Sequence, residues 1–269
     1  MEFGICLQGV IPVRAEPSHR SEMVTQILFG ELYRITEKNG VWNRVQLVFD
    51  EYEGWIHYLQ THTLEEEEFL RLEHSETPVS LDLVQLVIRE SRNDMLPAPL
   101  GSSLPGLANG QLTISGATFL YDGAVSTFTP VETLKSGAER DAFCLRLTQD
   151  AILYHNAPYL WGGRTPLGID CSGFVQMVFK LQHIKLLRDT TLQASQGEVI
   201  GLLFEALPAD LVFFDDEEGK INHVGMLLNR NTVIHCSGQV RIDPIDQEGI
   251  FNTELMKYTH KLRLIKRMF

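Results

Sequence analysis

The stretch PYLWGGRTPLGIDCSGFVQMVFK, residues 158–180, joins a glycine-rich loop to the start of a helix. Its glycines and Pro166 predict a tight loop, because glycine tolerates backbone conformations that other residues avoid and proline restricts the chain. The apolar residues from Phe174 to Phe179 recur at helical spacing, so a helix is predicted to begin near Asp170. Cys171 therefore falls in the first turn of that helix.

The first turn of a helix is a suitable place for a nucleophilic thiol. Backbone N–H groups there lack partners within the helix, and the positive end of the helix dipole favours a thiolate over a thiol. The same N–H groups can stabilise the oxyanion of a tetrahedral intermediate. The sequence therefore predicts that Cys171 is a catalytic nucleophile.

A thiol nucleophile needs a base, and His223 is the candidate. It lies in INHVGMLL, residues 221–228, whose alternating apolar residues predict a strand. A second strand, TVIHC at 232–236, follows after a short turn, so a hairpin is expected to bring His235 opposite His223. His235 would then fix the tautomer of His223, and the predicted catalytic triad is Cys171, His223 and His235.

A zinc site is an alternative interpretation of these side chains, because Cys171, His223, His235 and Cys236 are all residue types that bind zinc. Cys236 adjoins His235 on the predicted strand and would point to the opposite face, so we predict no metal and no cofactor. The four cysteines of the chain are far apart and form no CxxC pair, so we expect reduced thiols.

The C-terminal half, residues 137–269, is predicted to be an α+β domain. A helix-like rhythm is followed by the apolar segments DLVFF, HVGMLL, TVIHC and KLRLIKRMF, which read as strands. A helix layer packed on an antiparallel sheet is the architecture that this order favours. The apolar residues that show the helix-like rhythm are Phe143, Leu145, Leu147, Ile152 and Leu153.

The N-terminal half reads as short strands interrupted by turns. Residues 1–64 predict a small β-barrel, and residues 65–136 predict a linker with a second small β domain. The acidic run EEEE at 65–68 is interpreted as a solvated linker or helix face.

Composition excludes some classes of function. The chain of 269 residues is 44% hydrophobic and carries a formal net charge of −12, which argues against nucleic-acid binding because that requires clustered cations. It shows neither a basic leader nor a run of 18 apolar residues, so we expect no membrane span and a cytoplasmic location. A chain whose export signal had been removed would look the same. A monomer is favoured.

The motifs WGG, GxDCSGFVQ and HVG, followed by a strand with a histidine, resemble the NlpC/P60 family over residues 137–269. The resemblance implies a papain-like fold and hydrolysis of amide bonds in peptidoglycan peptides, typically beside γ-linked D-glutamate. It also implies that Tyr159 is the family's tyrosine near the thiol. Asp170 and Ser172 match positions that help to hold substrate in relatives.

The N-terminal half resembles bacterial SH3-like modules, on the strings EPSHRSEMVTQILFGE at 16–31 and DEYEGW at 50–55. Two small all-β SH3-like barrels before a papain-like domain resemble the γ-D-glutamyl-L-diamino acid endopeptidase subgroup, also called dipeptidyl-peptidase VI, which recycles murein peptides. The resemblance implies that Glu22 and Tyr52 read the free N-terminal L-Ala of the substrate. Asp189 matches the acidic partner of the substrate ammonium.

The expected function is hydrolysis of the bond between γ-D-glutamate and L-Lys or meso-diaminopimelate in murein tripeptides and tetrapeptides, through a thioester on Cys171. One alternative is an exported wall-lytic hydrolase whose SH3-like domains anchor it to polymeric peptidoglycan. Another is a binding protein that has lost catalysis.

Overall fold

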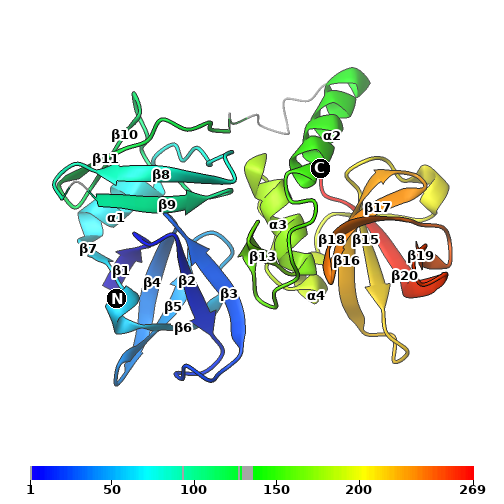
Figure 1. Cartoon of the computed structure of the whole chain (residues 1–269), viewed down its shortest axis with the longest axis horizontal. Helices are drawn as coiled ribbons and strands as arrows, with labels where there is room; N and C mark the ends of the chain where they lie inside the picture. Colours follow the sequence, from blue (N-terminus) through cyan, green and yellow to red (C-terminus); the bar gives the residue numbers. More distant parts are fainter. Residues whose placement is uncertain (1, 93, 127, 129–135) are drawn as a thin grey trace. The chain divides into compact units, whose positions relative to one another are not determined.

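The computed structural model divides the chain into two compact units, each of which is shown in Figure 1. Unit 1 is mostly β, and unit 2 combines helices with an antiparallel sheet, so the predicted α+β class is confirmed. None of the helices that the structure describes has both the length and the apolar run that a membrane span needs. The bounds of the units are Met1–Phe128 and Thr129–Phe269, and the residues described are 2–92, 94–126, 128 and 136–269.

The first sheet of unit 1 has the order β3-β2-β6-β5-β4-β1-β7. Burial alternates along its strands, as in β2, because successive side chains point to opposite faces of a sheet. The predicted short strands of this half are confirmed. Their bounds are β1 (Glu2–Ile5), β2 (Val10–Arg14), β3 (Met23–Leu28), β4 (Leu32–Asn39), β5 (Trp42–Leu47), β6 (Glu53–His57) and β7 (Thr63–Leu64), with a 3-10 turn η1 (Tyr58–Gln60).

The second sheet of unit 1 shares a hydrophobic core with the first. Ile5 and Phe29 of the first sheet region belong to the same buried cluster as Val87 and Phe119 of the second. The predicted boundary near residue 64 therefore separates elements that pack together, and the three-part domain division stays a prediction. The sheet has the order β10-β11-β8-β9, and its elements are β8 (Val84–Arg89), β9 (Asp94–Pro99), β10 (Gln111–Ile114) and β11 (Ala117–Leu120).

The acidic run at 65–68 enters a helix, α1 (Glu66–Glu73), that joins the two sheets along the chain. Its first turn holds three glutamates, which the positive end of the helix dipole stabilises. Phe69 and Leu72 anchor the helix to the shared core.

Unit 2 is built on a sheet of order β14-β20-β15-β16-β17-β18, in which β19 also pairs with β20. The helix α3 packs against α2 and against β16 and β17. The elements are α2 (Gly137–Ile152), β12 (Arg164–Thr165), β13 (Gly168–Ile169), α3 (Cys171–Leu181), α4 (Thr190–Gln193), β14 (Glu198–Ile200), η3 (Leu203–Glu205), β15 (Leu211–Asp215), β16 (Ile221–Asn229), β17 (Thr232–Ser237), β18 (Gln239–Pro244), β19 (Gly249–Asn252) and β20 (Lys257–Arg267).

The predicted helix is present as α2, but only some of its apolar residues are buried. Leu145, Ile152 and Leu153 are exposed, because they lie off the stripe that a 3.6-residue period directs toward the core. A capping box between Ser136 and Glu139 starts the helix. The residues on its buried face are Phe143, Cys144, Leu147 and Ala151.

Gly30 generates a stability prediction for unit 1. Its φ is +76°, and a Cβ there would lie 1.8 Å from the carbonyl oxygen of Ser103. Gly40 has a φ of +58°, but a Cβ there would meet no heavy atom within 4 Å. We expect Gly40→Ala to lower the free energy of unfolding by about 1–2 kcal/mol through backbone strain alone. Gly30→Ala should cost a further ~1–3 kcal/mol from the clash.

Urea unfolding followed by circular dichroism measures both losses. Equal losses for the two variants would contradict the close approach of Gly30 to Ser103.

Candidate active site

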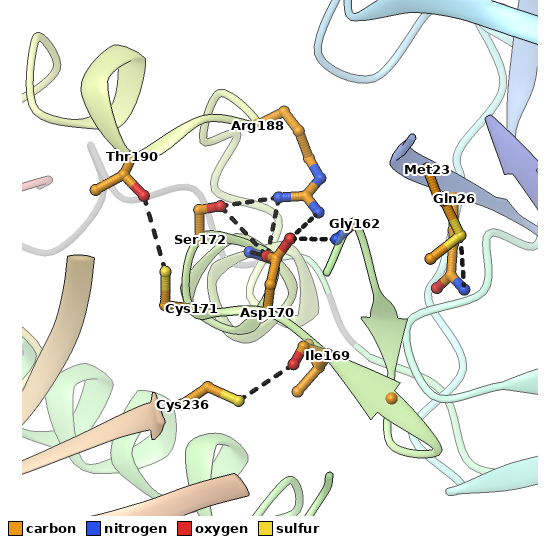
Figure 2. A network of polar contacts seen from close by, with 12 residues as sticks. Met23, Gln26, Gly162, Ile169, Asp170, Cys171, Ser172, Arg188, Thr190 and Cys236 are labelled. Carbon is orange, nitrogen blue, oxygen red and sulfur yellow. Dashed lines mark hydrogen bonds and ion pairs between the residues drawn. The ribbon is translucent and has the colours of Figure 1, made fainter. Parts of the chain in front are cut away.

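The carboxylate of Asp170 joins the glycine-rich loop to the start of α3. Asp170 caps the helix, with Oδ1 accepting a hydrogen bond from the backbone N–H of Gly173 at 2.6 Å. Its Oδ2 accepts another from the N–H of Gly162 at 2.8 Å. A Cβ on Gly173 would lie 2.3 Å from the carbonyl oxygen of Gly163, so only glycine fits there. This close packing fixes the position of Cys171 (Figure 2).

Arg188, which was not predicted to be part of the site, neutralises the charge of Asp170. The Arg188 side chain is buried, and its two terminal nitrogens donate to the two carboxylate oxygens at 3.0 and 2.6 Å. One of them also donates to Ser172 Oγ at 2.8 Å (Figure 2). Such a bidentate ion pair between an arginine and a carboxylate is strong and directional. Asp170 and Ser172 thus have structural partners, and their predicted contact with substrate stays a prediction.

The thiol of Cys171 is buried at the first turn of α3. Burial, followed by the charge of Asp170, raises its pKa to about 11, although Thr190, the backbone N–H of Val224 and the charge of Arg188 oppose the shift. The Sγ atom lies 3.9 Å from Thr190 Oγ1. The position of Cys171 in the first turn is as predicted, but the predicted bias toward a thiolate is wrong for the resting protein. Burial is the largest cause of the shift, because desolvation disfavours the charged thiolate.

The structure brings His223 and His235 together. His223 Nε2 lies 2.9 Å from His235 Nδ1. The register pairs His235 with Gly225, so His235 lies two residues from the position directly opposite His223, and a bulge lies between Leu227 and Asn229. Because side chains alternate along a strand, His223 still lies on the same face as His235.

Asp243, which was also not predicted to be part of the site, extends this pair of histidines. His235 Nε2 lies 3.0 Å from Asp243 Oδ2, and the guanidinium of Arg241 donates to both carboxylate oxygens at 2.6 and 3.0 Å. Burial opposes ionisation of Asp243, but the hydrogen bonds from His235 and Arg241 outweigh it and lower its pKa to about 2. The sequence feature that could have predicted this role is the aspartate, Asp243, on the strand that follows the strand of His235.

The ionised Asp243 determines where the protons lie. A carboxylate only accepts hydrogen bonds, so His235 Nε2 must carry a hydrogen and His235 Nδ1 must accept one. It follows that His223 Nε2 donates to His235, which leaves the lone pair of His223 on Nδ1. A lone pair on Nδ1 is what a general base at His223 needs.

His223 is a neutral base in the resting protein. Burial, and then the neighbouring His260 and His235, lower its pKa well below 6.5. The His260 ring stacks on the His223 ring with centroids 4.2 Å apart. Burial likewise lowers the pKa of His260 to about 4. The thiol of Cys171 and the imidazole of His223 are therefore both neutral in the resting protein.

The three imidazoles also form a set of metal-ligand type. One ring nitrogen each from His223, His235 and His260 lie within 4.8 Å of one another, and imidazole suits zinc. A metal ion there would replace the 2.9 Å contact between His223 and His235. Cys236, which the zinc alternative included, instead donates its thiol hydrogen to the carbonyl of Ile169 at 3.1 Å (Figure 2).

Tyr159 and Asp189 lie around the thiol in unit 2. Burial, followed by the negative charge of a Cys171 thiolate, raises the pKa of Tyr159 to about 12. The backbone N–H of Tyr159 donates to Gly238 at 2.9 Å and holds the segment in place. Asp189 is the N-cap residue of α4, directly before Thr190. Their roles toward substrate remain predictions.

Glu22 and Tyr52 lie at the same end of the first sheet of unit 1. Arg14, at the end of β2, pairs with Met23 of β3 on one side and with Trp55 of β6 on the other. Because β3 and β6 both run antiparallel to β2, both begin at that end. Glu22 directly precedes β3, and Tyr52 directly precedes β6. Their predicted recognition of L-Ala stays a prediction.

Comparison with known proteins identifies the family. The sequence pattern of the NlpC/P60 family matches residues 156–259, and that of the bacterial dipeptidyl-peptidase Sh3 domain matches residues 13–58. The chain is 30% identical over 244 residues to a gamma-D-glutamyl-L-lysine dipeptidyl-peptidase of Bacillus subtilis, covering 87% of this chain and 74% of that protein. The chain belongs to the NlpC/P60 family.

Two further relatives agree with this membership. Dipeptidyl-peptidase 6 of Lysinibacillus sphaericus is 25% identical over 260 residues, covering 87% of this chain and 88% of that protein. The crystal structure of an NlpC/P60 family protein from Bacillus cereus matches with a TM-score of 0.80 over 99% of both chains, at 18% identity. The predicted fold of an NlpC/P60 cysteine peptidase with SH3-like domains is thereby confirmed.

Alkylation tests the protonation state of this NlpC/P60 site. Because the pKa of Cys171 is about 11, we expect its rate of modification by iodoacetamide to rise with pH toward that value. Mass spectrometry of the peptide that contains Cys171 measures the rate. A rate already at its plateau at pH 6 would mean that the resting site holds a thiolate and an imidazolium.

Substitution of Asp243 tests the proton arrangement. In Asp243→Asn, an amide N–H facing His235 would favour the opposite tautomer of both imidazoles and place a hydrogen on His223 Nδ1. We expect kcat for peptide hydrolysis to fall by about 10²-fold or more, since a positioned general base contributes that much. Imidazole ¹⁵N chemical shifts report the tautomer directly.

Glu254→Gln is the matched control, because Glu254 is exposed and binds only the outer side of Arg241 at 3.2 Å. Unchanged tautomers and an unchanged kcat in Asp243→Asn would rule out this role for Asp243.

Proposed function

We propose that this protein is a cysteine endopeptidase that hydrolyses the bond between γ-D-glutamate and a diamino acid in murein peptides with a free N-terminal L-Ala. The observation that carries the proposal is the hydrogen-bonded series His223, His235 and Asp243 beside a helix that begins at Cys171. The names of the relatives from Bacillus subtilis and Lysinibacillus sphaericus support a dipeptide-releasing activity.

In the proposed reaction, His223 Nδ1 takes the thiol proton while the sulfur of Cys171 attacks the γ-carbonyl carbon of D-glutamate. Backbone N–H groups at the first turn of α3 stabilise the oxyanion that forms. The imidazolium is stabilised through His235 by the ionised Asp243. As the tetrahedral intermediate collapses, His223 gives its proton to the leaving α-amine, the C–N bond breaks, and a thioester remains on Cys171.

Water completes the reaction. His223 takes a proton from the water that attacks the thioester carbon, and the C–S bond then breaks. The proton returns to the sulfur, so the products are the dipeptide L-Ala-D-Glu and a regenerated thiol. The enzyme ends each cycle in the neutral pair that the raised pKa of Cys171 and the lowered pKa of His223 favour.

The N-terminal domain supplies specificity in this proposal. Glu22 and Tyr52 are assigned to the free N-terminal L-Ala of the substrate, and Asp189 is assigned to the substrate ammonium, since a cationic amine calls for carboxylates. The match of residues 13–58 to the bacterial dipeptidyl-peptidase Sh3 domain supports this assignment. A free tripeptide or tetrapeptide with its amine exposed is a recycling substrate, so the proposal includes a cytoplasmic site of action.

Peptide hydrolysis tests the proposal. We expect the protein to release L-Ala-D-Glu from L-Ala-γ-D-Glu-L-Lys, with chromatographic detection. N-terminal acetylation of the peptide should lower kcat/KM by about 10²-fold, because it removes the ammonium that the carboxylates bind. Cys171→Ala should abolish turnover and keep the fold. Cys144→Ala, on α2, is the control variant and should retain turnover.

Two results would overturn the proposal in different ways. Turnover by Cys171→Ala would refute the nucleophile. Cleavage of intact sacculi, with no loss on acetylation of the free peptide, would instead indicate the wall-lytic alternative.

A further inference from the structure

Three histidines from three strands of one sheet meet in unit 2. They are His223 on β16, His235 on β17 and His260 on β20, and we call them the histidine cluster. Their ring centroids lie 4.2, 5.1 and 5.4 Å apart, and one ring nitrogen from each lies within 4.8 Å of the other two. His260 was not predicted to be part of the site, and the proposed reaction gives it no role.

The sheet explains why His260 reaches the other two histidines. β15 lies between β16 and β20, and its Phe214 pairs with His223 on one side and with Leu262 on the other. His260 is two residues before Leu262, so it lies on the same face, because side chains alternate along a strand. The Phe214 ring contacts both imidazoles, with centroids 5.7 Å from His223 and 5.9 Å from His260.

The spacing of the histidine cluster suits a zinc ion. Zn–N bonds of about 2.0–2.1 Å in tetrahedral geometry place the ligand nitrogens about 3.3 Å apart. The nitrogens His223 Nε2 and His235 Nδ1 are 2.9 Å apart, and the whole cluster falls within 4.8 Å. The required separation thus lies between the shortest distance and the outer limit of the cluster. Zinc has no geometric preference from its d electrons, so it tolerates small movements of the rings.

His235 is already oriented as a metal ligand. Its Nε2–H donates to Asp243 at 3.0 Å, so the lone pair of Nδ1 is directed toward His223. A histidine that binds a metal almost always donates its other ring N–H to a carboxylate, a carbonyl or water. Asp243 is in turn held by two hydrogen bonds from Arg241. This support from the carboxylate is independent of the spacing of the three rings.

A cavity gives ions a route to the histidine cluster. His223 and the half-buried His260 line a cavity of about 1080 Å³ in unit 2. Its wall also carries Asp216, Glu217 and Glu248, so its carboxylates outnumber the single lysine there. A concave surface with an excess of negative charge raises the local concentration of cations.

We infer that the histidine cluster binds a zinc ion that inhibits the peptidase reversibly. A neutral imidazole that binds a metal through Nε2 carries its hydrogen on Nδ1. Binding therefore moves the His223 hydrogen from Nε2 to Nδ1 through water, and the lone pair that the general base needs is lost. His235 needs no such transfer, because its hydrogen is already on Nε2. The metal site does not depend on the proposed function, whereas the inhibition rests on it.

Competition with a chromogenic chelator measures zinc binding to the full chain. We expect His260→Phe to weaken Zn²⁺ binding by more than about 10²-fold, because loss of a residue that only orients a metal ligand already costs about 10- to 100-fold. Phenylalanine keeps an aromatic ring against His223, and circular dichroism checks that the variant is folded. His155→Gln changes an exposed histidine of unit 2 outside the cluster, so it is the matched control and should keep the wild-type affinity.

A zinc ion held by the thiolate of Cys171 is the competing explanation. In Cys171→Ala the zinc affinity should be unchanged, because no thiol belongs to the histidine cluster. Co²⁺, used in place of Zn²⁺, should give the visible absorption of a tetrahedral site without the near-ultraviolet charge-transfer band of a cobalt–sulfur bond. Loss of zinc affinity in Cys171→Ala, or such a band in the wild-type protein, would overturn the assignment to the three histidines.

Inhibition is measured as hydrolysis of L-Ala-γ-D-Glu-L-Lys at increasing free Zn²⁺. We expect inhibition over the same concentrations as binding and recovery after addition of a chelator. His260→Phe should resist these concentrations, relative to its own rate without zinc.

Three results would contradict the inference or its basis, and each is distinguishable. Equal zinc affinity in the wild-type protein and His260→Phe would exclude the metal site. Tight binding with an unchanged rate of hydrolysis would exclude the inhibition. No hydrolysis by the zinc-free wild-type protein would overturn the proposed function and leave the metal site standing.

Discussion

The buried ion pair between Asp170 and Arg188 is the interaction on which the rest of the site depends. One carboxylate caps α3, holds the glycine-rich loop through Gly162, and is neutralised by a guanidinium that also binds Ser172. Loss of one partner of such a pair leaves an uncompensated buried charge, which typically costs about 3–5 kcal/mol. The position of Cys171 follows from this pair, because the thiol sits between its two anchored neighbours.

A second buried carboxylate, Asp243, has a different effect. It orders the hydrogens along His235 and His223 and leaves the lone pair of His223 on the nitrogen that a base requires. The two acids act on different parts of the candidate site: Asp170 positions Cys171, and Asp243 orients His235 and His223. Both are held by an arginine, whose guanidinium is always charged in proteins.

Much of this arrangement could be predicted from the sequence, because it depends on local patterns. Glycines followed by a helical apolar stripe predict the start of α3, and alternating apolar residues predict the hairpin that carries His223 and His235. The rest depends on tertiary packing. Nothing in the sequence tells which arginine reaches Asp170, and the raised pKa of Cys171 arises from burial that only the folded chain creates. In the hairpin His235 pairs with Gly225, two residues from His223, and the bulge between Leu227 and Asn229 changes this register by only one residue.

The common core of the two sheets in unit 1 limits how the N-terminal half can be treated as modular. Phe29, in the turn after β3, and Phe119, in β11, contact edge to face with centroids 6.4 Å apart, inside one buried cluster. A fragment that ended after β7 would expose part of this cluster to solvent as a hydrophobic patch. The two sheets therefore depend on each other for their folded state, and unit 1, Met1–Phe128, is the smallest part of the N-terminal half that keeps this core closed.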